Sequence, residues 1–350
     1  MSFIDTIEIK NFKSIRHQKI EGCKRINVFI GYPNVGKSNI LEALSLASSD
    51  LKNSNRSISL RDLCRYEDII GLFNDGNNQK EIQITINNEF AFILEYLNQN
   101  TILYEVVSAD LLSTFKKGDT SIPSKRSVVD KSGNFTEPSL HTGRSQPKIK
   151  IKKYHFKENQ NSEKNNPTIL DFPFGNNLFE VLRYNGDLRK QSGELFVNYD
   201  LKLAFDEDTR LKIQKQLDEY SVFQIPLLQV SDTLQRLIFH KAAINTNENT
   251  VLLFEEPEAH MFPPYIKKFT TDVIFDKTNQ FFITTHSPYV LDELIAEASN
   301  DLAVYLVDYK NGESKIYYLK EEDLQEIREY GVDLFFNIES YLKHGQVDNA

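Results

Sequence analysis

The sequence has few cysteines and no long hydrophobic run, and both absences narrow the classes of protein that it can represent. Its two cysteines, Cys23 and Cys64, form no CxxC motif. We therefore expect neither a disulfide framework nor a cysteine-based zinc site, as is typical of a reducing cytoplasm. No apolar run approaches the ~18 residues of a transmembrane helix. The opening residues, MSFIDTIEIKNFKS, lack the apolar core of an export signal, so we predict a cytoplasmic protein without a membrane partner.

Acidic residues outnumber basic ones overall, but basic residues are concentrated in one segment. The net charge of −9 argues against a protein that is coated by nucleic acid. Residues 116–157 nevertheless hold eleven Lys or Arg against three acids, a net of +8, which leaves −17 for the rest of the chain. Lysines alternate with isoleucines in KIKIKKY (Lys148–Tyr154), which predicts a strand with one basic face. Two interpretations stay open: an edge strand protected by lysines, and a DNA phosphate-binding patch over residues 144–157.

The order of the expected elements predicts an α/β core with an antiparallel, β-rich insertion. With 350 residues, 40% of them apolar, the chain can form one large domain or two smaller ones. The expected strands are Phe3–Ile9, Arg16–Ile20, Arg25–Gly31, Glu81–Asn87, Glu89–Leu97, Thr101–Val107, one starting at Val251, Gln280–Ser287 and Leu302–Tyr309. The expected helices are Asn39–Ser48, one near Leu60–Leu72, Asp206–Tyr220, Val230–Ala243, Pro263–Phe275, Tyr289–Ala298, Glu321–Glu329 and Leu334–Leu342.

A phosphate-binding loop follows the third expected strand. The residues GYPNVGKS (Gly31–Ser38) fit G-x-x-x-x-G-K-S between a strand and a helix, which is the context that this motif requires. Glycines let several backbone N–H groups converge on phosphate oxygens, and the helix N-terminus adds a positive dipole. Lys37 is expected to hold the β- and γ-phosphates of ATP, and the Ser38 hydroxyl to bind Mg²⁺. The predicted nucleotide contacts are Gly31, Asn34, Gly36, Lys37, Ser38 and Asn39.

Two further strands end in polar side chains that suit the same site. In VLLFEEPEAH a buried apolar run ends in two acids, which would be costly without a positive partner. A strand beside the P-loop strand would place Glu255 near Mg²⁺ and Glu256 near the γ-phosphate, where Glu256 could orient or deprotonate water. His286 in TTHS ends another apolar strand and is the predicted γ-phosphate sensor. The alternatives are a solvated pair of acids and a hydrogen-bonded histidine at a strand end.

The motifs together resemble one ATPase group. A GTPase would need an N/TKxD motif, which is absent, and the DxxG at Asp68–Gly71 follows no buried strand. In contrast, four segments resemble ABC-type P-loop ATPases of the RecF, SMC and OLD group: IEIKNFKSI, the P-loop, FEEPEAHMFPP and TTHSP. The resemblance is greatest to stand-alone bacterial AAA-labelled ATPases related to OLD proteins, and it covers about residues 1–50 and 220–310.

This resemblance implies an ABC-type head with a helical lid. The head would comprise residues 1–80 and 221–310, interrupted by an inserted β-rich and basic subdomain at 81–220. Residues 311–350 would form a helical tail.

The resemblance also assigns roles. Glu255 takes the metal-binding Walker B position, Glu256 the catalytic glutamate and His286 the switch histidine, whereas the Q-loop glutamine has no clear counterpart. In the family, heads pair head to tail, and a Ser-x-Gly signature at a helix N-terminus caps the γ-phosphate of the other head. Here Ser231 matches the serine, but Thr233 stands where glycine is usual. A side chain at that position would hinder close backbone approach, so we expect altered geometry or slower turnover.

The expected role follows from what is attached to the head. In this group ATP joins two heads and hydrolysis releases them. About 40 residues follow Tyr309, too few for the Toprim nuclease domain of OLD proteins, and residues 81–220 show no coiled-coil heptads. By analogy we expect a slow ATPase acting as a dimeric or oligomeric switch in an anti-phage system, with a separate nuclease or toxin as effector. A RecF-like DNA-repair ATPase and a non-hydrolysing, ATP-dependent scaffold are the alternatives.

Overall fold

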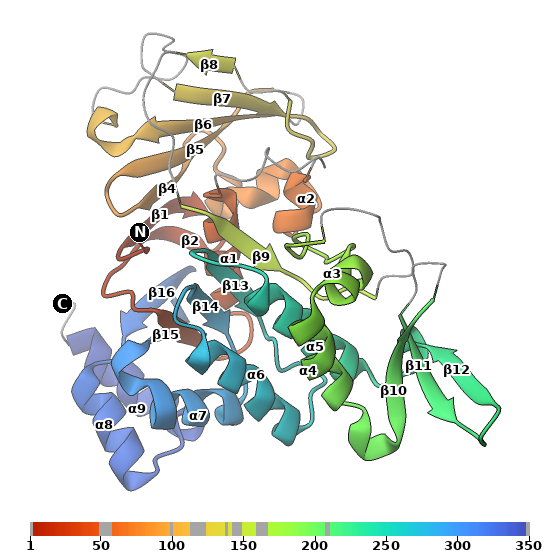
Figure 1. The fold of residues 1–350 in the computed structure, drawn as a ribbon. Helices are drawn as coiled ribbons and strands as arrows, with labels where there is room; N and C mark the ends of the chain where they lie inside the picture. Colours follow the sequence, from red (N-terminus) through yellow and green to blue (C-terminus); the bar gives the residue numbers. More distant parts are fainter. Residues whose placement is uncertain are drawn as a thin grey trace.

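The computed structural model describes residues 3–48, 58–98, 101–112, 124–136, 139–141, 149–158, 167–206 and 211–347. These residues form a central six-stranded sheet, a seven-stranded antiparallel sheet and a small three-stranded sheet (Figure 1). The central sheet has the strand order β16-β15-β3-β14-β13-β9, and β16 alone runs antiparallel to its neighbour. Its strands are β3 (Ile26–Ile30), β9 (Ile151–Tyr154), β13 (Val251–Glu255), β14 (Gln280–Thr284), β15 (Leu302–Lys310) and β16 (Glu313–Tyr318).

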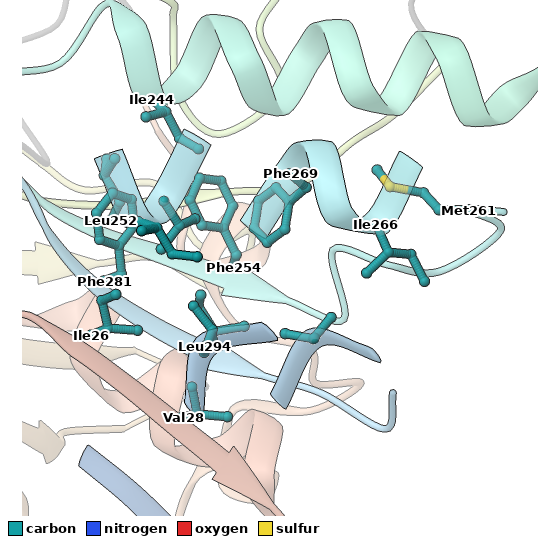
Figure 2. Close-up of a cluster of buried hydrophobic side chains, with 14 of the residues drawn as sticks. Ile26, Val28, Ile244, Leu252, Phe254, Met261, Ile266, Phe269, Phe281 and Leu294 are labelled. Carbon is teal, nitrogen blue, oxygen red and sulfur yellow. The ribbon is translucent and has the colours of Figure 1, made fainter. Parts of the chain in front are cut away.

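The apolar strands of this sheet are buried because both of its faces are covered. Alternate residues of β3 enter different cores: Ile26, Val28 and Ile30 pack in one cluster, and Phe29 in the other. The first cluster includes α5 (Asp232–Asn245), α6 (Pro263–Phe275) and α7 (Pro288–Ala298), as Figure 2 shows. The second cluster includes α1 (Lys37–Leu46) and strands of the antiparallel sheet. Two-sided burial explains why these strands read as continuous apolar runs.

The antiparallel sheet contains the expected meander. Its order is β2-β1-β4-β5-β6-β7-β8. The strands are β1 (Ile7–Phe12), β2 (Ile15–Ile20), β4 (Ile82–Ile86), β5 (Phe90–Tyr96), β6 (Ile102–Ser108), β7 (Ser124–Val129) and β8 (Ser139–His141). Because β4 pairs with β1, with Ile7 opposite Ile86, the strands after residue 81 extend the sheet begun at the N-terminus.

The prediction of a helix at Asp206–Tyr220 is wrong. Residues 211–216 form β11 (Leu211–Gln216), the middle strand of a sheet with β10 (Leu201–Phe205) and β12 (Val222–Pro226). Leu211 and Ile213 alternate with polar residues, and Ile213 is buried in the core beside α5. This period of two is that of a strand with one face packed.

The remaining predicted helices occur, with one shortened. Leu60–Leu72 contains only the short helix α2 (Leu60–Leu63) and a 3₁₀ turn at Ile69–Leu72, because the backbone is extended at Cys64 and again at Asp68. The other helices are α3 (Leu178–Tyr184), α4 (Gly186–Glu194), α8 (Glu321–Tyr330) and α9 (Leu334–Val347). Within the described ranges, no helix is both long enough and apolar enough to cross a bilayer.

Strand β9 is an edge strand, as one of the two interpretations of the lysine-rich segment expects. It pairs with β13 alone in the central sheet. The predicted basic face is wrong at Lys152, whose ammonium is buried and donates to Asn247 Oδ1 at 2.7 Å. Lys153 is buried as well, and Lys150 is exposed. Positions 142–148 of the expected phosphate-binding patch lie outside the described residues.

Candidate nucleotide-binding site

The P-loop connects β3 to α1, and its two framing glycines are required by their surroundings. A Cβ on Gly31 would clash with the backbone carbonyl of Val307 in β15. Gly36 has a φ of +99°, and a Cβ there would clash with the hydroxyls of Ser314 and Ser14. Only glycine tolerates both the left-handed conformation and the close approach. The loop therefore keeps its backbone curled around the space in which a phosphate would lie.

Lys37 is held inside this loop. Its ammonium donates to the carbonyls of Gly31 and Tyr32, both at 2.9 Å, and the residue is 5% exposed. An ammonium has three donors, so these two bonds leave one N–H for a ligand. Burial lowers the pKa of Lys37 to about 8, although Glu256 and Glu258 oppose this shift.

We predict that ATP binding takes up a proton above about pH 8. In the free protein a growing fraction of Lys37 is neutral as pH rises past its pKa of about 8. Phosphate favours the charged form, so the bound protein recovers the proton. Calorimetry in buffers of different ionisation enthalpy should show proton uptake near one at about pH 9 and much less at pH 7. Equal uptake at both pH values would contradict the assignment.

A cavity of about 600 Å³ opens beside the P-loop. It lies where parallel strands end at their carboxyl edges, the usual ligand position in α/β sheets. It is lined by Pro33, Asn34, Gly36, Lys37, Ser38, Asn39, Arg65, Tyr154, His155, Phe156, Arg236, His240, Glu255, Glu256, Ala259 and His286. The predicted site residues thus come together, apart from two. Gly31 lies beneath and holds Lys37 through its carbonyl, and Ser231 is not in the lining.

The expectation that the Val251 strand lies beside the P-loop strand is wrong. Strand β14 separates β13 from β3. Because all three strands are parallel, their carboxyl ends still meet at one edge, and Ser38 lies close enough to Glu255 to lower the pKa of its carboxyl. The intervening β14 brings His286 next to Glu256, with Nε2 and Oε1 3.4 Å apart.

Glu256 occupies a strained turn at the mouth of the cavity. Its φ is +43°, which is uncommon for a residue with a side chain, and its N–H donates to Thr284 O at 2.9 Å. The side chain is 45% exposed, so a water molecule can reach it. Burial and the charge of Lys37 lower the pKa of the neighbouring His286, which leaves a neutral imidazole at pH 7.

Glu258 holds this turn to the end of β14. One of its oxygens accepts from Thr285 Oγ1 at 2.6 Å and from the His286 N–H at 2.9 Å. Burial raises the pKa of Glu258, and its other oxygen is buried and has no hydrogen-bond partner within the described part of the chain. Glu258 was not among the residues that the sequence predicted for the site. Its position shows that it orients the backbone of His286.

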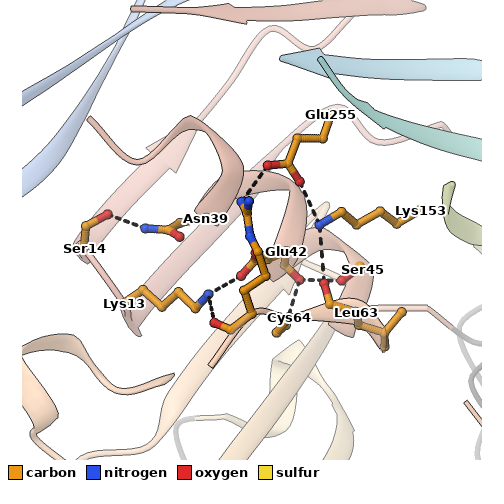
Figure 3. Close-up of polar contacts among 10 residues, drawn as sticks. Lys13, Ser14, Asn39, Glu42, Ser45, Leu63, Cys64, Lys153 and Glu255 are labelled. Atoms are coloured by element: carbon orange, nitrogen blue, oxygen red, sulfur yellow. Dashed lines mark hydrogen bonds and ion pairs between the residues drawn. The ribbon is translucent and has the colours of Figure 1, made fainter. Parts of the chain in front are cut away.

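Glu255 is paired with two cations that sequence reasoning missed as partners. Arg65 Nη2 lies 2.6 Å from Oε1 of Glu255, and Lys153 Nζ lies 3.1 Å from Oε2 (Figure 3). Burial alone would raise the pKa of Glu255, but Lys153, Ser38 and Arg65 outweigh it and hold the pKa at about 2. The carboxylate is therefore ionised at every physiological pH.

The start of α5 is connected to the loop that follows Glu256. Thr233 Oγ1 donates to the carbonyl of His260 at 2.6 Å, which gives a structural use to the side chain that replaces the usual glycine. Ser231 is exposed, and its hydroxyl does not cap its own helix. The Ser231 hydroxyl is therefore free to contact a ligand from outside the chain's own cavity.

The residues present fit a magnesium–nucleotide complex. The Ser38 hydroxyl and the Glu255 carboxylate are the oxygen ligands that Mg²⁺ prefers, and Mg²⁺ usually completes its shell with waters and substrate phosphates. Among the described residues, no group of three or more His, Cys, Asp or Glu side chains is placed to hold a metal by itself. The P-loop supplies the cradle for the phosphates and Lys37 a buried cation.

Comparison with known proteins agrees with this geometry. A family model described as "AAA domain, putative AbiEii toxin, Type IV TA system" matches residues 26–292, which include the P-loop, both glutamates and His286. The chain belongs to this family. It is also 23% identical over 381 aligned positions to an ATP/GTP phosphatase of Helicobacter pylori, covering 96% of this chain and 98% of that protein.

Other similarities are more local or concern the fold. The chain is 30% identical over 148 residues to the DNA replication and repair protein RecF of Thermoanaerobacter sp. strain X514, covering 37% of this chain and 40% of RecF. An SMC head crystallised with the C-winged helix domain of ScpA has a TM-score of 0.51 at 15% identity, over 93% of this chain and 100% of that one. The predicted fold, an ABC-type P-loop ATPase head of the RecF/SMC group, is confirmed.

Proposed function

We propose that this family member is a slow, Mg²⁺-dependent ATPase whose bound nucleotide joins two heads, as the regulatory component of an anti-phage system with a separate effector. One observation carries the catalytic part. A single cavity contains a buried lysine, a hydroxyl beside an ionised carboxylate, and a half-exposed carboxylate beside a neutral histidine. That set matches what phosphoryl transfer to water requires: charge stabilisation and a positioned nucleophile.

Each residue then has a chemical task. Lys37 and the P-loop amides hold the β- and γ-phosphates, and Ser38 with Glu255 hold Mg²⁺, which offsets the charge on the phosphate oxygens. Glu256 orients the attacking water and accepts its proton while the bond from the γ-phosphorus to the ADP oxygen breaks. His286, 3.4 Å from Glu256, contacts the γ-phosphate and registers its loss.

The proposed pairing of two heads rests on the position of Ser231, which is not among the residues that line the cavity of its own chain. Ser231 is exposed and lies at the N-cap of α5. Exposed aromatic side chains follow three of the site's motifs: Tyr32 in the P-loop, Phe262 between β13 and α6, and Tyr289 in the first turn of α7, at 47%, 64% and 59% exposure. A second copy would cover these rings and bring its Ser231 and helix dipole to the γ-phosphate.

We expect ATP with Mg²⁺ to double the sedimenting mass of the protein, and Ser231→Arg to prevent this without weakening ATP binding. A bulky cation at the helix N-terminus obstructs the partner's phosphate and opposes the helix dipole. Analytical ultracentrifugation with and without nucleotide measures the effect. Ser132→Arg, at an exposed serine in the turn after β7, is the matched control. A wild-type mass that does not respond to ATP, or unimpaired pairing of Ser231→Arg, would exclude this arrangement.

The biological role rests on the family. Its description includes a putative toxin of a type IV toxin–antitoxin system, which supports a role beside a partner in defence. The RecF similarity favours a second candidate, a DNA-binding repair ATPase. Phage challenge of cells that express this chain with its neighbouring genes separates the two. Protection that is lost with Lys37→Met supports defence, whereas strongly salt-dependent DNA binding by the isolated protein without protection supports repair.

A further inference from the structure

Two carboxylates, one fully buried and one 13% exposed, form a connected cluster with three cations (Figure 3). The cluster reaches the cavity through Glu255 and Arg65. Glu42 in α1 is fully buried and contacts Lys13 and Arg65, with Arg65 Nε 3.1 Å from its Oε1. Glu255 contacts Arg65 and Lys153 through different oxygens. Arg65 therefore bridges the two acids, and each acid also has a lysine of its own.

The three cations differ in how firmly they are held. The side chains of Lys13 and Lys153 are 13% and 6% exposed, whereas that of Arg65 is 70% exposed. Lys153 is fixed on β9 beside β13, and it also donates to the carbonyl of Leu63 at 3.4 Å. If the guanidinium of Arg65 moved into solvent, both acids would keep a buried lysine. Its departure therefore leaves no buried charge unpaired, which is the costly outcome for such a cluster.

The charges of this cluster do not balance. Two carboxylates face three cations, a surplus of one positive charge, and Lys37 lines the same cavity. Both oxygens of Glu255, the expected metal ligand, are already occupied by cations. A divalent cation at Glu255 would compete with these two cations and would add to the positive surplus. A bound polyphosphate would offset the positive surplus with its negative charge, and it would give the Arg65 guanidinium a new partner.

We propose that Arg65 is a displaceable counter-ion on Glu255, which keeps the metal position closed until a nucleotide brings Mg²⁺ with it. The proposal rests on the function proposed above, because it concerns the same metal position. It makes metal and nucleotide binding mutually dependent, so each raises the affinity of the protein for the other by the same factor. Arg65 is a positioning residue here: it acts through Glu255.

Mn²⁺ binding to the nucleotide-free protein tests this, with electron paramagnetic resonance as the readout. We expect Arg65→Gln to bind Mn²⁺ about tenfold more tightly than wild type, because the competing charge is gone. Arg65→Lys keeps the charge and should stay near wild type. The gain should disappear in the Glu255→Gln, Arg65→Gln double variant. Arg236→Gln is the matched control, because Arg236 lines the same cavity but pairs with Asp232 at 2.7 Å.

Equal Mn²⁺ affinities of wild type and Arg65→Gln would overturn the proposal, as would a gain that survives without the Glu255 carboxylate or that Arg236→Gln reproduces.

A second readout is the ratio of ATP affinities with and without Mg²⁺. That ratio should be smaller in Arg65→Gln than in wild type, and an unchanged ratio also counts against the proposal. These two negative outcomes can be distinguished from failure of the proposed function, because in that case the wild-type protein would bind no ATP at all. Arg65 is exposed, so the thermal unfolding midpoint of its variants should stay close to that of wild type.

Discussion

Glu256→Gln is expected to lower ATP turnover by about 10²- to 10⁴-fold, the usual contribution of a general base. Glu256 lies at the mouth of the cavity, half-exposed and 3.4 Å from His286, where it can hold a water against the γ-phosphate. Glutamine keeps the shape and the hydrogen-bonding reach but cannot accept the proton. ATP affinity should change little, because the phosphates are held by Lys37 and the P-loop. The variant should therefore accumulate as an ATP-bound pair of heads.

Phosphate release and sedimentation in parallel measure this. Glu297→Gln removes an equal charge from an exposed position on α7 outside the cavity, and it should turn over like wild type. Full activity of Glu256→Gln would remove Glu256 as the base. If wild type and Glu256→Gln both bind ATP, pair and fail to release phosphate, the chain is a scaffold that uses ATP without hydrolysing it.

Lys37→Met is expected to weaken ATP binding by about 10- to 100-fold, the value of a hydrogen bond to a charged group. Among the residues that the structure describes, the ammonium bonds only to the Gly31 and Tyr32 carbonyls, and one donor is left for phosphate. Methionine fills similar space without charge or donors. Removing a partly desolvated ammonium should not destabilise the fold, so the loss should appear in affinity and not in the unfolding temperature.

Fluorescence titration with a labelled ATP analogue measures this loss. Lys190→Met, at an exposed lysine of α4 away from the cavity, is the control and should bind like wild type. Unaltered affinity of Lys37→Met would mean that the nucleotide lies elsewhere in the molecule.

Local patterns predicted most of the core and the position of the site. The strand at β3, the P-loop and α1 follow one another in the sequence, so their contacts need no knowledge of distant residues. The acids at the end of β13 were expected to meet the P-loop because their strand was expected to lie beside the P-loop strand. In the structure β14 separates β13 from β3, but the site still comes together because parallel strands end at one edge.

What escaped prediction depends on contacts between distant segments. Arg65 and Lys153 are 190 and 102 residues from Glu255 in sequence, and neither belongs to a motif. The lysines of β9 were expected on one solvent-facing side, but the strand is covered on both faces and Lys152 bonds inside, to Asn247. Neither the Lys–Ile alternation of KIKIKKY nor the apolar run at Val251 predicts this burial. It depends on the pairing of β9 with β13, which is a contact between segments far apart in the sequence. Strand β11 differs from these cases, because the alternation of Leu211 and Ile213 with polar residues is present in the sequence and was interpreted as a helix.

Calorimetric titration of the wild-type protein with ATP in the presence of Mg²⁺ tests the central claim most directly. The account predicts saturable binding with one nucleotide for each chain, which requires Mg²⁺ for full affinity and is greatly weakened in Lys37→Met. Folded wild-type protein that shows no saturable binding of ATP with Mg²⁺ would contradict it.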